Sequence, residues 1–157
     1  MIDGLSIVPD FVTPADESFY LTELGRLPGP RGGRRVKRWG CTVYPDHRAE
    51  PEDVPPPWLR ELGARLPMHA PDEFTLNDWP PGAALAHHVD FGGPVICVVS
   101  LLGDGVLQFK AHGRPHVTVI CPRRGLCVMA GVARTVYQHA VMPSADARIS
   151  LVFRTIR

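Results

Sequence analysis

The residues of this sequence best suited to hold a metal ion are His88 and Asp90, which stand two positions apart. On an extended strand, residues two apart point to the same face, so this imidazole and this carboxylate can bind one ion from the same side. The best candidate for a third ligand is His139. Two histidines and one carboxylate form the facial triad of non-haem Fe(II) oxygenases, which leaves coordination positions open for a co-substrate and O2.

A second group of polar residues lies near the end of the chain. If residues 148–156 form a strand, Arg148, Ser150 and Arg154 share one face, and the apolar residues between them share the other. Guanidinium groups bind carboxylate oxygens in pairs, so two inward arginines suit a dicarboxylate. A metal triad together with a dicarboxylate site predicts a 2-oxoglutarate-dependent dioxygenase.

Length and composition predict a single domain over residues 1–157. The N-terminus lacks the basic and apolar regions of a signal peptide, and no apolar run is long enough to cross a membrane. None of the four cysteines has CxxC spacing, so we expect reduced thiols in a cytoplasmic protein that does not bind membranes. No feature of the sequence indicates an obligate protein partner.

The charge balance, with 17 Lys and Arg against 16 Asp and Glu, is not that of a general nucleic-acid binder. Six cations nevertheless crowd into residues 26–38 without an acid among them. This basic stretch is either a solvated loop or a phosphate-contacting patch beside the site. Trp39, which follows it, is either a core residue or a stacking partner for a flipped base.

The predicted fold is α+β and mainly β, with two helices before a long β region that forms a sandwich or jelly roll. Helical spacing predicts helices over 14–27 and 58–66, and residues 46–57 are expected to form an irregular loop. Short apolar runs between turns predict strands at 39–44, 74–79, 85–89, 95–102, 106–110, 116–121, 125–129, 135–140 and 148–156.

Over residues 34–157 the sequence resembles the AlkB family of Fe(II)- and 2-oxoglutarate-dependent dioxygenases. Five segments resemble family motifs in the family's order: the segment 77–82, the pair His88 and Asp90, the strands at 98–101 and 107–109, the run 122–131 followed by His139, and the terminal Arg148-x-Ser150-Leu151-x-Phe153-Arg154. Segments 34–40 and 122–124 are most similar to the branch that contains the eukaryotic tRNA wobble-uridine hydroxylase.

The resemblance implies a double-stranded β-helix (jelly-roll) core with supporting N-terminal helices. It implies Fe(II) held by His88, Asp90 and His139, with 2-oxoglutarate and O2 as co-substrates. It places Arg148 at the distal carboxylate of 2-oxoglutarate and Arg154 near Asp90. The further residues that it places at the co-substrate are Asn77, Ser150 and Trp79, the last standing where the family has a tyrosine.

By this resemblance, the expected function is hydroxylation or oxidative demethylation of a modified nucleobase in RNA or DNA. Arg35, Lys37 and Trp39 are the expected substrate contacts. Gly92 stands where base-demethylating relatives often have an acidic residue. Two alternatives remain: an oxygenase of the same fold that hydroxylates a small molecule or a protein side chain, and a catalytically silent binding module. Steep salt dependence of substrate binding would favour nucleic acid, because phosphate contacts release counterions.

Overall fold

The computed structural model describes residues 2–25, 35–43 and 49–156. The first part of the basic stretch, residues 26–34, lies outside the described residues, and so do the predicted end of the first helix and the predicted end of the strand at 39–44. No described helix has both the length and the apolar character needed to cross a membrane.

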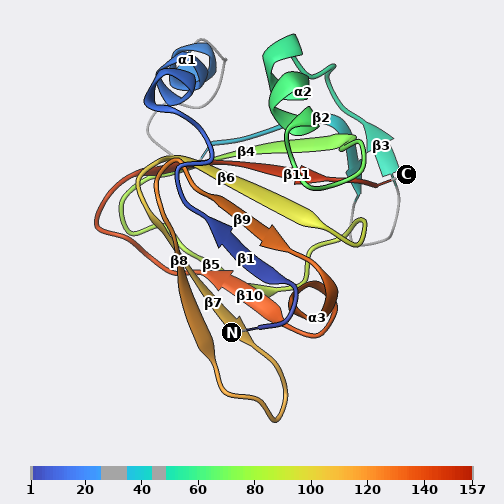
Figure 1. Ribbon diagram of the computed structural model, residues 1–157, viewed down its shortest axis with the longest axis vertical. Coiled ribbons are helices and arrows are strands. Elements are labelled where there is room, and N and C mark those ends of the chain that lie inside the picture. Colours follow the sequence, from blue (N-terminus) through green and yellow to red (C-terminus); the bar gives the residue numbers. More distant parts are fainter. Residues whose placement is uncertain (1, 26–34, 44–48, 157) are drawn as a thin grey trace.

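Two antiparallel sheets form the body of the protein (Figure 1). Among the described residues, the larger sheet has the strand order β1 (Leu5–Val8), β9 (Leu126–Met129), β6 (Ile96–Leu102), β11 (Arg148–Arg154), β4 (Glu73–Trp79), β2 (Arg35–Val43), β3 (Ala49–Pro51). The smaller sheet has the order β5 (Leu85–His88), β10 (Gln138–Val141), β7 (Gly105–Lys110), β8 (Val117–Cys121). The predicted jelly-roll core is confirmed.

Helices α1 (Pro14–Gly25) and α2 (Pro57–Ala64) cover the outer face of the larger sheet, and the smaller sheet faces its inner side (Figure 1). Strand β11 shows the alternation that the sequence predicts. Leu151 and Phe153 pack in the core beneath the helices, whereas Val152 packs in the second core, between the sheets. Arg148 and Arg154 share the face of Val152, so strand periodicity turns both arginines toward the space between the sheets.

Helix α1 begins with a reciprocal cap between Thr13 and Asp16. The backbone N–H of Asp16 donates to the Thr13 hydroxyl, and the backbone N–H of Thr13 donates to the Asp16 carboxylate, each at 3.0 Å. Phe19 of this helix is 50% exposed although it is apolar. Glu17 is buried, and Arg123, from the turn between β8 and β9, donates to both of its carboxylate oxygens.

Several element boundaries differ from the prediction. Strand β2 begins at Arg35, because its polar first half pairs residue by residue with β4. Strand β3 lies within the predicted loop at 46–57, and strand β1 and the short helix α3 (Gly131–Thr135) were not predicted. Strands β1 and β3 are only four and three residues long and lie at the edges of the larger sheet. At such positions pairing with a neighbouring strand, rather than the local sequence pattern, decides the conformation.

Gly40, within β2, is a position that requires glycine. Its φ is +84°, and a Cβ there would overlap the carbonyl oxygen of Asp72. We predict that Gly40→Ala lowers the free energy of unfolding by at least about 2 kcal/mol, because the cost of a left-handed backbone at alanine and the cost of the steric clash add. Gly25→Ala is the control, since a Cβ at this helical position meets open space. Denaturant unfolding should show equal or higher stability for this control; equal losses in both variants would contradict the assignment.

Candidate metal centre

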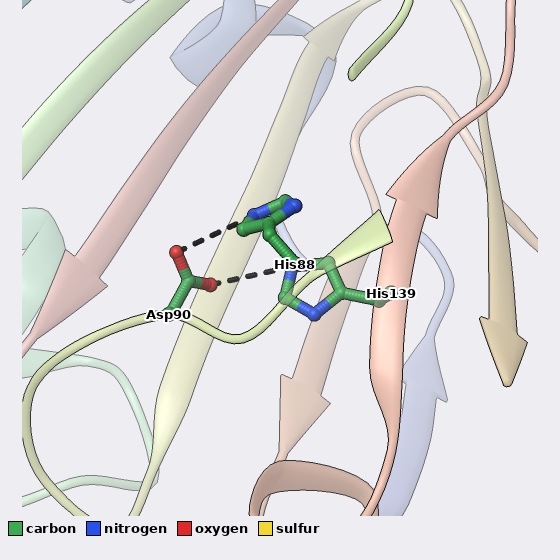
Figure 2. A group of neighbouring side chains, drawn as sticks. All are labelled: His88, Asp90 and His139. Carbon is green, nitrogen blue, oxygen red and sulfur yellow. Dashed lines mark ion pairs between the residues drawn. The ribbon is translucent and has the colours of Figure 1, made fainter. Parts of the chain in front are cut away.

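The side chains of His88, Asp90 and His139 meet at one point between the two sheets (Figure 2). The carboxylate of Asp90 lies between the two rings, with Oδ1 3.7 Å from His88 Nε2 and Oδ2 3.3 Å from His139 Nε2. One ligand atom from each residue lies within 4.8 Å of the others. The three residues that the sequence singles out are therefore brought together with their donor atoms converging.

The smaller sheet positions the two histidines. His139 of β10 stands directly opposite His88 of β5, and the ring centroids are 4.4 Å apart. The next pair is Val141 with Leu85, so the register shifts by one residue in β5. Leu85 and His88 therefore both line the cavity although they are three residues apart. Such a β-bulge re-aims side chains beside functional sites. His88 Nδ1 lies 2.9 Å from the Ala86 carbonyl oxygen, and a proton donated there leaves Nε2 to face Asp90.

A largely buried arginine fixes the carboxylate of Asp90. Arg154 donates to Asp90 Oδ1 at 2.7 Å and to Glu73 Oε2 at 3.1 Å. Burial alone raises the pKa of Asp90, but the Arg154 guanidinium and the neighbouring imidazoles of His139 and His88 outweigh it and hold this pKa well below its usual value. Asp90 is therefore ionised at neutral pH, as a metal ligand must be.

The donor set fits Fe(II). Two imidazole nitrogens and one carboxylate, all on one side, are the ligands that non-haem Fe(II) oxygenases use, and they leave positions open toward the space in front of them. That space is a cavity of about 300 Å³ between the sheets. Its lining includes the whole triad, so a metal ion held there would face the cavity.

Arg148 lies in the same cavity, at the other end of strand β11, and has the properties of an anion-binding group. It is 4% exposed, and burial lowers the pKa of its guanidinium. One Nη lies 3.4 Å from the Ser100 hydroxyl, whereas Nε has no hydrogen-bond partner. Within the described part of the chain, no carboxylate forms an ion pair with Arg148. A buried guanidinium of this kind is costly unless an anion joins it, and a carboxylate suits its planar fork.

The other predicted co-substrate residues surround Arg148 and the space beside it. Trp79 stands opposite Arg148, and Asn77 stands opposite Ser150, in the antiparallel pair of β4 and β11. All of these residues line the cavity. Both predicted arginines face the cavity, and Arg154 lies beside Asp90 as expected. Arg154 is already bound to two carboxylates, so Arg148 is the guanidinium left for a dicarboxylate.

The three predicted substrate contacts on β2, Arg35, Lys37 and Trp39, do not line the cavity but share the outer face of the sheet. Trp39 is 3% exposed and packs in the core beneath the helices. Arg35 lies 3.4 Å from the Leu24 carbonyl oxygen and pairs with Asp78, and Lys37 pairs with Asp53. Among the described residues of β2, Arg38 lines the cavity.

Sequence reasoning also missed Glu73 and Phe91, both of which line the cavity. A signal for Glu73 was present, since Glu73, Thr75 and Asn77 are polar at every second position of β4, while Phe74 and Leu76 between them are apolar. Phe91 directly follows a proposed ligand, but nothing in the sequence distinguishes its ring from a core residue.

No protein-family model matches the chain. The tRNA (carboxymethyluridine(34)-5-O)-methyltransferase of Xenopus tropicalis is 30% identical over 158 residues, covering 89% of this chain and 25% of that protein. The "Probable RNA/DNA demethylase ALKBH6" of Danio rerio is 31% identical over 160 residues, covering 85% of this chain and 67% of that protein. The chain thus spans about a quarter of the length of the first relative and two thirds of the second.

Solved structures of low sequence identity share the fold. The structure of OsALKBH1 has a TM-score of 0.70 at 15% identity, with 99% of both chains covered. An oxidoreductase of the 2OG-Fe(II) oxygenase family from Burkholderia pseudomallei has a TM-score of 0.69 at 16% identity, with 96% of this chain and 82% of that chain covered. These two similarities agree with the two-sheet architecture described above.

Removing one ligand of the triad tests the metal site. We predict that His88→Ala abolishes stoichiometric Fe(II) binding in anaerobic calorimetry, because two ligands on one side hold the ion poorly. His87→Ala is the matched control: the neighbouring histidine of β5 does not line the cavity, so its loss should leave binding unchanged. Equal Fe(II) affinity in the His88→Ala variant and the wild type would refute the assignment.

Glu73 tests the role of the charge network behind the ligand. We predict that Glu73→Gln weakens Fe(II) binding by about tenfold, because Arg154 is then neutralised by Asp90 alone and the site loses one negative charge. Asp78→Asn removes the same charge from the outer face of the same strand and should leave the affinity unchanged. A Glu73→Gln variant with wild-type Fe(II) affinity would mean that Glu73 acts only on stability.

Proposed function

Because the chain belongs to the AlkB family of Fe(II)- and 2-oxoglutarate-dependent oxygenases, we propose that it oxidises a modified nucleobase in RNA or DNA, with Fe(II), 2-oxoglutarate and O2. The observation that carries this proposal is the shared cavity. One part of its wall is the triad of His88, Asp90 and His139, and another part is the buried guanidinium of Arg148, which has no carboxylate partner among the described residues. Together they suit one metal ion and one dicarboxylate.

Each group of the cavity then has a defined task. His88, Asp90 and His139 hold Fe(II), and Arg148 binds the distal carboxylate of 2-oxoglutarate. The neighbouring residues Asn77, Trp79 and Ser150 shape the space for the co-substrate. Fe(II) with 2-oxoglutarate and O2 supplies the conversion of a substrate C–H bond to C–OH, with succinate and CO2 as the other products. The apolar lining excludes water from this oxidation and consists of Leu85, Val98, Leu107, Met129, Val141 and Val152.

The choice of nucleic acid rests on the relatives, since the names of both refer to RNA or DNA as substrates. Transfer RNA with a modified wobble uridine is the first substrate to test, because that substrate is named for the Xenopus relative. Oxidation of an N-methyl carbon would give a hemiaminal that releases formaldehyde. Oxidation of a side-chain methylene would leave a stable alcohol. Action in the cytoplasm is part of the same proposal.

Succinate formation with a panel of methylated and wobble-modified oligonucleotides tests this function. Stimulation by one oligonucleotide is the expected result, and formaldehyde release separates demethylation from stable hydroxylation. Turnover that only a small molecule or a protein side chain stimulates would overturn the nucleic-acid assignment and keep the oxygenase. An Fe(II)-loaded protein without any 2-oxoglutarate turnover would overturn both and leave the silent binding module.

Arg148 gives a separate test of the co-substrate site. We predict that Arg148→Gln raises KM for 2-oxoglutarate at least about tenfold, because a buried charge-assisted hydrogen bond to a carboxylate is lost. Fe(II) affinity without 2-oxoglutarate should stay the same, since Arg148 does not contact the triad. Arg60→Gln, at an exposed position of α2, is the control. An unchanged KM in the Arg148→Gln variant would place the dicarboxylate elsewhere.

A further inference from the structure

The entrance of the cavity is marked by two side chains of different chemistry. Of the described residues that line the cavity, all are buried or half-buried except Arg38 and Phe91. Arg38 comes from β2 of the larger sheet, and Phe91 comes from the chain just after β5 of the smaller sheet. A molecule that reaches the metal from solvent therefore passes a cation and an aromatic ring.

Phe91 is held in place beside the triad. It directly follows Asp90, and the residue is 37% exposed. The next two residues are fixed, because Arg134 donates to the Gly92 carbonyl oxygen at 3.2 Å and the Gly93 N–H donates to the Thr155 carbonyl oxygen at 2.6 Å. Gly92 has a φ of +107°, and a Cβ there would lie 2.8 Å from the side chain of Ile156. The turn after Phe91 is thus closely packed, and the ring is presented from a fixed backbone.

Arg38 differs from the other cations of β2 in its direction. It stands opposite Thr75, which also lines the cavity, whereas Lys37 stands on the outer face and is paired with Asp53. Within the part of the chain that the structure describes, the Arg38 guanidinium forms no ion pair. It is an exposed positive charge at the entrance of a cavity, and a guanidinium binds phosphate oxygens well.

We infer that Arg38 and Phe91 form the nucleotide-reading entrance of this site, an inference that rests on the function proposed above. Phe91 stacks on the base that enters the cavity, and Arg38 binds a phosphate of the same strand. Stacking on one aromatic ring accepts any base, because every base has a π face. A base that must reach the metal has to be unpaired, so the substrate presented to this entrance is single-stranded or flipped out.

The test measures binding of a short fluorescent single-stranded RNA to the full chain loaded with 2-oxoglutarate and Mn(II) in place of Fe(II). We expect Phe91→Leu to weaken binding about tenfold and Phe91→Trp to keep it, because an aromatic face is restored. Arg38→Gln should weaken binding and lower the slope of log Kd against log salt by about one. Lys37→Gln, one residue away on the outer face, is the matched control and should bind as the wild type does.

Two failures are distinguishable. If the wild type binds the RNA, and both Phe91→Leu and Arg38→Gln bind it with wild-type affinity and salt slope, the entrance assignment is wrong and the proposed function stands. If the wild type binds no RNA and 2-oxoglutarate turnover needs a different substrate, the nucleic-acid function fails and the entrance assignment fails with it. Thermal melting of each variant shows that the fold is retained.

Discussion

The two ion pairs of the largely buried Arg154 guanidinium are the interactions on which the site depends. This guanidinium bonds to Asp90 and to Glu73, so it joins the loop after β5 to the central strands of the larger sheet. Two carboxylates around one cation leave a net negative charge, which favours a metal ion. A buried guanidinium without both partners would be costly, so the network fixes the distance between the two sheets at the point where the ligands must converge.

The rest of the cavity follows from strand alternation. Strand β11 carries Arg154 near the metal end and Arg148 far from it, on the same face, while Leu151 and Phe153 anchor the other face beneath the helices. One strand thus sets both the carboxylate ligand and the anion-binding group. Gly105 permits this packing, because a Cβ at that position would lie 2.5 Å from the Arg148 guanidinium. The triad, the Arg148 guanidinium and the exposed pair of Arg38 and Phe91 all line this one cavity.

Much of this arrangement could be predicted from the sequence, because the alternation of polar and apolar residues along a strand indicates which face of the sheet each side chain occupies. The alternation in residues 148–154 correctly turned Arg148 and Arg154 inward. For strand β2 the sequence did not indicate which side chains face the cavity, because residues 35–38 are mostly charged on both faces. Only Trp39 sets the orientation of the strand, and its burial turns Lys37 to the outer face. The bulge in β5 could not be predicted either, since alternation alone puts Leu85 and His88 on opposite faces. The pairing of Glu17 with Arg123 joins residues 106 positions apart, beyond any local pattern.

The most direct test of the account is the position of iron in a crystal of the protein grown without oxygen in the presence of Fe(II) and 2-oxoglutarate. Anomalous diffraction at the iron edge locates the ion independently of any assumption about its ligands. We predict one iron peak within bonding distance of His88 Nε2, Asp90 and His139 Nε2, with the far carboxylate of 2-oxoglutarate on Arg148. Iron bound elsewhere, or 2-oxoglutarate bound away from Arg148, would contradict it.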